Sequence, residues 1–291
     1  MFTVFGATGN TGSIVVDRLL AAGKRVRAVA RSAEKAALLA AKGAEPMLGD
    51  VTDRAVVAEA LAGAEGAYLL APPDLRSDDL LAKNRAVIDA YAAGLAAARV
   101  PHAVFLSSVG AHVEAETGPI RIARHAENTL SRVAGTTLTF VRAPFFMENI
   151  LNNAAVMKSD GVLPVFGGGE EHPFPMIASR DIGETAAEAL LSPPRETSFL
   201  ELGGPREYSF ADAARLASAI LGREVSATPV PLEALVPTLT RFGFSENVAG
   251  LFREMTEAVM KGLIRYEGKG RRVTGKVDLS AVLRSGLGGG A

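Results

Sequence analysis

The stretch Phe2-Thr3-Val4-Phe5-Gly6-Ala7-Thr8-Gly9-Asn10-Thr11-Gly12 decides the fold of this chain. Its start predicts a short strand, its glycines predict a tight turn, and residues 13–22 predict a helix. Gly6 allows the turn, Gly9 lets the backbone approach a phosphate, and Gly12 lets the helix pack closely on the strand. Because the amides that open a helix attract anions, the stretch predicts a site for the pyrophosphate of a dinucleotide. The residues expected to contact that cofactor are Gly6, Thr8, Gly9, Asn10, Thr11 and Gly12.

The composition is that of a globular, enzyme-like protein. The chain has 291 residues, of which 48% are hydrophobic and 22% are charged, which suits one large domain or one domain with a smaller lobe. The net charge is −1, so no overall field attracts nucleic acid or an anionic membrane. Cysteine is absent, which excludes disulfides, thiol catalysis and thiolate metal sites.

No targeting or membrane segment is recognisable in the sequence. No apolar run approaches the roughly 18–20 residues of a membrane-spanning helix. The glycine-rich turn begins at residue 6, which leaves no room for a signal or transit peptide before it. We therefore expect a cytoplasmic protein that acts on a small molecule, without a membrane or nucleic-acid partner.

Strand and helix patterns alternate through the first half of the chain. Short apolar runs predict strands at residues 26–30, 44–48, 66–70, 103–106 and 138–141. Helix patterns lie between them at residues 33–42, 54–62, 77–98 and 120–133. Thr52 or Asp53 is expected to cap the helix at 54–62. Repeated β-α units of this length require right-handed crossovers and a parallel sheet, so the sequence predicts a doubly wound α/β Rossmann fold.

The pattern changes after Pro144, where Gly and Pro become frequent and interrupt the alternation. Helices are predicted at 181–191, 210–221, 232–242 and 245–263, strands at 198–202 and 224–230, and a frayed end at 285–291. We therefore expect an NAD(P)-binding domain over residues 1–145. Residues 146–291 are expected to form a smaller C-terminal α/β lobe for the substrate, with some elements returning to the main sheet.

Arg31 and Lys35 follow the second strand, at the place that selects between coenzymes. A site for NAD usually has Asp or Glu about 20 residues after the glycine turn, where the carboxylate binds the ribose hydroxyls. This chain has Arg31-Ser32 there instead. A guanidinium can pair with a 2′-phosphate and stack on adenine, and Lys35 adds a second positive charge. We therefore predict NADP(H) in preference to NAD(H), the alternative being that Arg31 is merely solvated.

Other residues follow the carboxyl ends of strands, where ligands of open α/β sheets bind. Asp50 follows the third strand, and is expected either to accept a hydrogen bond from the adenine amino group or to help start the next helix. Ala71 and Pro72 follow the fourth strand. One interpretation of this pair is a rigid wall beside a ribose, and the other is a simple strand terminator.

Several sequence runs occur in the order that a known family has them. They are Gly6–Gly12, Ala30-Arg31-Ser32, Leu48-Gly49-Asp50, Leu106-Ser107-Ser108-Val109-Gly110, Arg142-Ala143-Pro144-Phe145-Phe146-Met147-Glu148-Asn149 and Ser179-Arg180-Asp181-Ile182. With these runs, nearly the whole chain resembles the NmrA-like family of atypical short-chain dehydrogenases/reductases. The resemblance implies a Rossmann domain with a small C-terminal lobe, and a nicotinamide near Pro144 and the end of the fifth strand. Family members include NADPH-dependent quinone and azo-compound reductases, and redox-sensing regulators that bind the cofactor without turnover.

One motif of catalytic short-chain dehydrogenases is missing. Those enzymes use Tyr-x-x-x-Lys on the helix after the fifth strand, together with a serine near the strand end. Ser107 or Ser108 can supply the serine, and Ser107 can also contact the cofactor, but the following helix contains neither Tyr nor Lys. The other candidates for proton transfer are His125 and His112, each of which can equally be a structural, hydrogen-bonded histidine. No catalytic residue is therefore assigned, and no histidine spacing indicates a metal.

Phe145, Phe146, Phe166 and Asn149 are the predicted pocket residues. An easily reduced acceptor needs proximity and an apolar, water-poor pocket, and solvent or a weak acid can supply the proton. The aromatic residues can form such a pocket if the lobe folds over the nicotinamide, although aromatics beside a strand end are more often core. Asn149 would orient the loop or a ligand carbonyl, and the Gly167–Gly169 run suits a mobile lid.

Two functions fit these observations. The first is an NADPH-dependent reductase of small apolar acceptors of the quinone or azo type, by direct hydride transfer without the Tyr-Lys pair. The second is a non-catalytic NADP(H) redox sensor acting through a partner protein, for which the basic residues between Lys261 and Lys276 are the one charge cluster of note. The missing pair favours the sensor. The aromatic segment after Pro144 and the lack of a partner motif favour the reductase, which is the function we predict.

Overall fold

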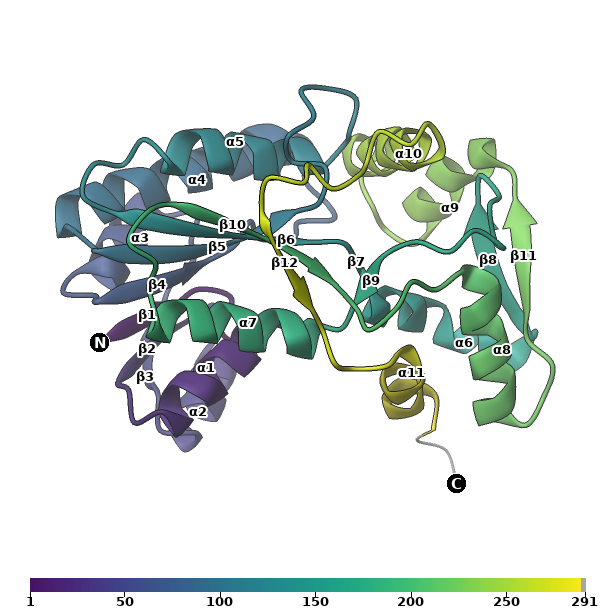
Figure 1. The fold of residues 1–291 in the computed structure, drawn as a ribbon, viewed down its shortest axis with the longest axis horizontal. Helices are drawn as coiled ribbons and strands as arrows, with labels where there is room; N and C mark the ends of the chain where they lie inside the picture. The colour runs from purple at the N-terminus through teal and green to yellow at the C-terminus, as the bar shows by residue number, and fades with distance from the viewer. Residues whose placement is uncertain (289–291) are drawn as a thin grey trace.

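An eight-stranded parallel β-sheet forms the centre of the molecule (Figure 1). The computed structural model describes residues 1–288. The strand order is β12-β10-β6-β5-β4-β1-β2-β3, and every pairing in the sheet is parallel. The strands are β1 (Phe2–Val4), β2 (Val26–Ala30), β3 (Glu45–Leu48), β4 (Gly66–Leu69), β5 (His102–Ser108), β6 (Thr137–Ala143), β10 (Ser198–Gly203) and β12 (Arg271–Thr274). The predicted doubly wound α/β fold is confirmed.

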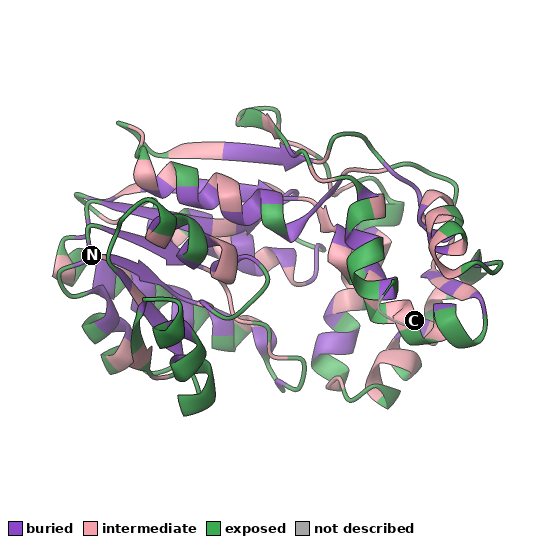
Figure 2. Cartoon of the chain, turned by 90° about the horizontal axis from the view of Figure 1, so that it is seen from below, coloured by how far each residue is buried: buried purple, intermediate pink, exposed green. Residues whose placement is uncertain are grey.

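Helices cover both faces of this sheet (Figure 1). The helices on one face are α1 (Gly12–Ala21), α2 (Ala33–Ala41) and α7 (Ser179–Leu191), and those on the other are α3 (Arg54–Leu61), α4 (Leu80–Ala98) and α5 (Ile120–Leu130). Phe105 of β5 faces the core beneath α3, α4 and α5, while its neighbour Val104 faces the core beneath α1 and α7. A strand buried on both faces has no reason to alternate apolar and polar residues, which explains its sequence. The buried residues follow the strands and the inner sides of the helices (Figure 2).

The direction in which the sheet is built reverses between β1 and β4. From β1 the chain passes through α1 on one face and goes on to β2 and β3. From β4 it passes through α4 on the opposite face and goes on to β5 and β6. Ligands of doubly wound sheets bind in the crevice that such a reversal opens at the carboxyl ends of the strands. The candidate site is therefore sought at this edge.

The turn between β1 and α1 needs glycine at two positions in particular. Gly6 has a φ of +62°, a conformation that other residues rarely adopt. A Cβ atom on Gly12 would lie 2.2 Å from the carbonyl oxygen of Gly6. Helix α1 therefore starts directly against the turn, as the sequence predicts for Gly12.

The remaining elements lie beside the sheet, most of them in a smaller unit, while α10 packs against the core of the main sheet (Figure 1). They are β7 (Phe145–Phe146), a 3-10 helix (Met147–Asn153), α6 (Ala154–Ser159), β8 (Val162–Phe166), β9 (Met176–Ile177), α8 (Phe210–Leu221), β11 (Ser226–Val230), a 3-10 turn (Leu232–Ala234), α9 (Leu235–Arg241), α10 (Glu246–Met260) and α11 (Leu279–Leu287). β8 pairs with β11 and β7 pairs with β9. Met147, Tyr208 and Leu283 belong to the core of this unit. No helix within residues 1–288 is both long and apolar enough to cross a membrane.

Some element boundaries differ from the predictions because a cap decides them. α4 begins at Leu80 and not at residue 77, since Asp79 accepts a hydrogen bond from the backbone N–H of Ala82. Of the two predicted caps of α3, the structure uses Asp53 and not Thr52.

The predicted frayed end is wrong for residues 285–287. α11 continues through them because Asp278 caps the helix and Leu283 and Leu287 are buried. Residues 289–291 of that prediction lie outside the described residues. β8 and β12 were not predicted, since Pro164 and the charged pair at 271–272 interrupt their strand patterns.

We expect Gly12→Ala to destabilise the protein by about 1–3 kcal/mol, because the added methyl group would overlap the backbone of the turn. Gly250→Ala is the matched control, since Gly250 lies in α10 and a Cβ there meets nothing within 4 Å. This control should gain stability, by up to about 1 kcal/mol, because Ala favours a helix. Urea unfolding of both variants measures the difference. A Gly12→Ala protein as stable as the unmodified one would contradict the close approach.

Candidate functional site

α1 begins without a side-chain cap. The helices that follow β2, β3 and β4 are capped by Ser32, Asp53 and Asp79, each of which accepts a hydrogen bond from a backbone N–H of the first turn. At α1 the N-cap residue is Thr11, whose side chain makes no such bond, and the first turn holds no acidic residue. The start of α1 therefore has no protein anion against its amides, which suits it to an anionic ligand.

Tyr68 accounts for the Thr11 hydroxyl. Tyr68 lies on β4, is fully buried, and donates from its hydroxyl to Thr11 Oγ1 at 2.8 Å. Burial raises the pKa of Tyr68, so its hydroxyl stays protonated and remains a donor. Thr8, Gly9 and Asn10 are exposed around the turn, whereas Thr11 is buried. Sequence reasoning missed Tyr68, because a tyrosine inside an apolar strand reads as core.

Arg31 and Asp50 lie at the ends of neighbouring strands. Arg31 and Lys35 are exposed, at the end of β2 and in the first turn of α2. Asp50 Oδ1 accepts from the backbone N–H and the hydroxyl of Thr52, both at 2.8 Å. Burial alone would raise the pKa of Asp50, but these hydrogen bonds and the charges of Arg31 and Lys83 lower it below its ordinary value. The bonds to Thr52 match the interpretation of Asp50 as a loop acid, and its contact with adenine stays a prediction.

A cavity of about 260 Å³ lies at the carboxyl ends of β4 and β5. Its walls come from the segment after β4, from α4 and α5, and from α10. The predicted residues Ala71, Pro72 and Ser107 all line it, although Ala71 and Pro72 follow β4 and Ser107 lies at the end of β5. Phe105 and Phe252 supply its aromatic surface. The structure thus brings residues from two strand ends together around one largely apolar space.

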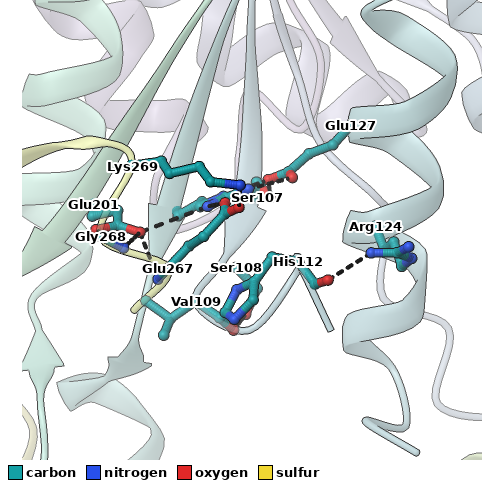
Figure 3. Close-up of polar contacts among 11 residues, drawn as sticks. Ser107, Ser108, Val109, His112, Arg124, Glu127, Glu201, Glu267, Gly268 and Lys269 are labelled. Carbon is teal, nitrogen blue, oxygen red and sulfur yellow. Dashed lines mark hydrogen bonds and ion pairs between the residues drawn. The ribbon is translucent and has the colours of Figure 1, made fainter. Parts of the chain in front are cut away.

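Ser107 lines this cavity and also contacts a buried cluster of charges, which Figure 3 shows. Ser107 Oγ donates to Glu127 Oε1 at 2.6 Å. Arg142 donates to both oxygens of Glu127, at 2.8 Å each. The side chains of Arg142 and Glu127 are only 4% and 8% exposed, so water does not compete for the pair. Two parallel hydrogen bonds fix the carboxylate in place, and Glu127 in turn fixes the Ser107 hydroxyl.

Two further carboxylates complete the cluster around Arg142. Arg142 Nη1 donates to Glu267 Oε2 at 2.6 Å and lies 3.6 Å from Glu201 Oε1. Glu201 also accepts from the backbone N–H groups of Glu267 and Gly268. Lys269 Nζ lies 2.7 Å from Glu267 Oε1. The segment before β12 is thereby held against the ends of β6 and β10 (Figure 3).

The charges in this cluster stabilise one another. Burial alone would lower the pKa of Arg142, but the hydrogen bonds and charges of Glu127 and Glu267 raise it. Burial alone would raise the pKa of Glu267, but Lys269 and Arg142 lower it to about 2. Arg142 and Glu267 are therefore both ionised at neutral pH.

Sequence reasoning missed the cluster, although signals for it exist. Glu127 occupies the buried stripe of α5, where a charged residue needs a buried partner. Arg142 and Glu201 stand inside the apolar runs of β6 and β10. The strand register places Ser107 opposite Arg142 and Arg142 opposite Glu201. A buried ion pair across neighbouring strands would follow from these positions once the strand order is known.

The candidate histidines do not line the cavity. His125 Nε2 lies 3.2 Å from Asp89 Oδ1 on α4 and 3.4 Å from the Thr129 hydroxyl, which matches its structural interpretation. His112 lies in the loop after β5, where its carbonyl oxygen accepts from Arg124 (Figure 3). Burial lowers the pKa of His112, whose Nδ1 has no hydrogen-bond partner among the described residues. Within residues 1–288, no group of three His, Asp or Glu side chains could hold a metal ion.

The predicted pocket residues Phe145, Phe146, Asn149 and Phe166 also lie outside this cavity. After β6 and Pro144 the chain leaves the main sheet, and β7 pairs with β9 instead. Phe145 then packs edge to face on a second aromatic ring of the smaller unit, with ring centroids 5.5 Å apart. Contact between these residues and a substrate stays a prediction.

Comparison with known proteins agrees with this architecture. The model of the NmrA-like family matches residues 1–268. The chain belongs to this family. An NAD(P)H azoreductase from Xenophilus azovorans is 31% identical over 88% of this chain and 86% of its own length. Quinone oxidoreductase 2 from Escherichia coli is 24% identical over 90% of this chain and 89% of its own length.

Solved structures share the fold of this NmrA-like protein. The triphenylmethane reductase of Citrobacter sp., complexed with NADP(H), has a TM-score of 0.77 at 21% identity and covers 98% of this chain and 99% of its own. The NADPH complex of a quinone oxidoreductase from Escherichia coli has a TM-score of 0.73 at 23% identity, over 99% of this chain and 95% of its own. At these identities the comparison establishes the fold.

We expect Glu267→Gln to lower the free energy of unfolding at pH 7, because the ionised carboxylate stabilises the folded protein through Arg142. The pKa of Glu267 is about 2 in the folded protein, below the ordinary 4.5. Its stabilisation is therefore complete above about pH 5 and is lost as the pH falls towards 2.

Urea unfolding at pH 7 and pH 3 checks this expectation, and the deficit of the variant should shrink at pH 3. Glu196→Gln, at an exposed loop position, is the control and should change the free energy of unfolding at neither pH. An equal deficit of Glu267→Gln at both pH values would contradict the lowered pKa.

Proposed function

We propose that this NmrA-like protein is an NADPH-dependent reductase of small apolar acceptors of the quinone or azo type. The observation that carries the proposal is the largely apolar cavity at the ends of β4 and β5. It lies beside the crevice where the strand order of the sheet reverses, between β1 and β4. Relatives named as an azoreductase and a quinone oxidoreductase support this class of acceptor.

The residues at the carboxyl edge of the sheet fit a dinucleotide. A Cβ on Gly12 would collide with the turn, and no side chain caps α1, so this turn would hold the pyrophosphate. Arg31 and Lys35 are exposed where the 2′-phosphate of NADP(H) would lie, which supports a preference over NAD(H). The residues that would border the rest of the coenzyme are Asp50, Ala71, Pro72, Ser107 and Pro144.

The contribution of the chain itself is to place the acceptor and to exclude water. Bound NADPH would supply the hydride. Phe105, Ile122 and Phe252 give the cavity apolar walls. α5 carries neither Tyr nor Lys, and the proton of Ser107 points to Glu127. An acceptor that takes its proton from solvent fits such a site better than an alcohol that must lose one to the protein.

Steady-state oxidation of NADPH with a panel of quinones and azo dyes tests the proposal. We expect turnover with apolar members of the panel, and no oxidation of simple secondary alcohols by NADP⁺, because the Tyr-Lys pair is missing. Tight NADP(H) binding without turnover of any acceptor would reject the reductase in favour of a redox sensor that acts through a partner protein.

We expect Arg31→Ala to weaken the binding of NADPH at least tenfold while changing that of NADH little, since only NADPH carries the 2′-phosphate. Titration calorimetry with both coenzymes measures the two affinities. Arg195→Ala, at an exposed loop position, is the control and should affect neither coenzyme. Equal losses for NADPH and NADH would mean that Arg31 does not contact the 2′-phosphate.

A further inference from the structure

Asn84 lines the cavity and has a buried side-chain oxygen without a hydrogen-bond partner. It lies on α4 and is only 1% exposed. Asn84 Nδ2 donates to the carbonyl oxygen of Leu80 at 3.1 Å, but Asn84 Oδ1 has no hydrogen-bond partner among residues 1–288. No other described residue that lines the cavity has a buried side-chain atom in this condition. A buried carbonyl oxygen is stabilised when a donor reaches it, so Asn84 indicates a ligand with such a donor.

The contact with Leu80 fixes which atom of the Asn84 amide is unpartnered. If the nitrogen and oxygen were exchanged, Oδ1 would face the carbonyl oxygen of Leu80, and two acceptors would repel each other. The amide therefore has one stable orientation, and in that orientation it leaves an acceptor unused.

The other polar side chains of the cavity have already used their donors. Ser107 donates to a buried carboxylate, and Ser108 donates to a backbone carbonyl oxygen at 2.9 Å. Asp74 is itself an acceptor and pairs with Lys83 at 2.6 Å. What these side chains still offer a ligand are acceptor positions, so the complementary ligand carries a donor.

The start of α4 is held in place from α10, which keeps this wall of the cavity fixed. Asn247 Oδ1 accepts from the backbone N–H of Leu80 at 3.1 Å, and Ser245 Oγ donates to the carbonyl oxygen of Ser77 at 2.6 Å. Phe252, on the same helix as Asn247, lines the cavity. Asn84 is thus held at the wall of a preformed, largely apolar cavity, where one hydrogen bond discriminates strongly between ligands.

We propose that Asn84 determines specificity: its Oδ1 accepts a hydrogen bond from an N–H or O–H group carried by a planar aromatic ring in the cavity. The inference rests on the proposed function for the identity of that ring. The hydrogen-bond donor belongs either to the substrate that is reduced, as in an amino-substituted quinone or azo dye, or to the carboxamide of the nicotinamide. Both sources present the same chemistry to Asn84.

Binding of a matched ligand pair tests the first source. 2-Amino-1,4-naphthoquinone and 2-methyl-1,4-naphthoquinone have nearly the same shape, but only the amino compound has a donor. We expect the unmodified protein to bind the amino compound about tenfold more tightly, since the methyl compound leaves Oδ1 unpaired. Asn84→Leu should remove this preference. Calorimetry measures both affinities without any turnover.

NADPH and its 3-acetylpyridine analogue test the second source, because a methyl group replaces the carboxamide NH₂ in the analogue. If the coenzyme supplies the donor, Asn84→Leu should weaken the binding of NADPH about tenfold and leave the affinity for the analogue unchanged. The quinone pair would then show no preference that depends on Asn84.

Asn84→Ser is the second variant. The serine hydroxyl is polar but too short to reach the position of Asn84 Oδ1, so this variant should also lose the affinity difference within the ligand pair. Asn128→Leu, at an exposed position of α5, is the control and should keep it. Equal affinities within both ligand pairs would overturn the inference, and so would a preference that Asn84→Leu and Asn84→Ser leave intact. If the preference depends on Asn84 but no acceptor is turned over, the proposed function fails and this inference stands.

Discussion

A guanidinium buried away from water must be surrounded by acceptors, because breaking a buried ion pair costs about 3–5 kcal/mol. Arg142 meets this requirement with carboxylates from α5, from β10 and from the segment before β12. It also lies 4.5 Å from the centre of the Phe199 ring. Each of these elements is thereby fixed relative to the end of β6, which is the edge of the sheet where the candidate site lies. The placement of Ser107, and through it one wall of the cavity, depends on this single charge being matched.

The two hydroxyl contacts nearest the site have a common consequence. Tyr68 holds the Thr11 side chain inside the turn, and Glu127 holds the Ser107 proton inside the sheet edge. What remains on the surface of the crevice are backbone amides at the start of α1 and acceptor atoms around the cavity. Under the proposed function, such a site would bind phosphate and position an aromatic ring, and it has few free side-chain groups that could transfer a proton. This is the physical reason for preferring an easily reduced acceptor over an alcohol.

Much of the fold can be predicted from the sequence because short stretches of residues determine it: the glycine turn, the apolar strand runs and the capped helices. The position of Ala71 and Ser107 at one cavity also follows from the sequence, since Ala71 comes just after β4 and Ser107 lies at the carboxyl end of its parallel neighbour β5. The Arg142 cluster could not be predicted in the same way, because its contact with Glu267 joins residues 125 positions apart. Nor could the course of the chain after Pro144, where pairing of β7 with β9 takes Phe145 into a separate core. Within the run Arg142–Asn149, which carries part of the family resemblance, Glu148 has a structural role: it accepts a hydrogen bond from the backbone N–H of Ser179 at the start of α7.

The late position of Glu267 and β12 matters during synthesis on the ribosome. The nascent chain exposes β1 to β6 and α5 well before residue 267 has been translated, so Arg142 can meet Glu127 while its third carboxylate is still missing. Closing the long loop between Arg142 and Glu267 is entropically costly. The outer edge of β10 has no partner strand until β12 pairs with it. The last carboxylate of the Arg142 cluster to be synthesised therefore comes from a segment that contributes no residue to the cavity itself.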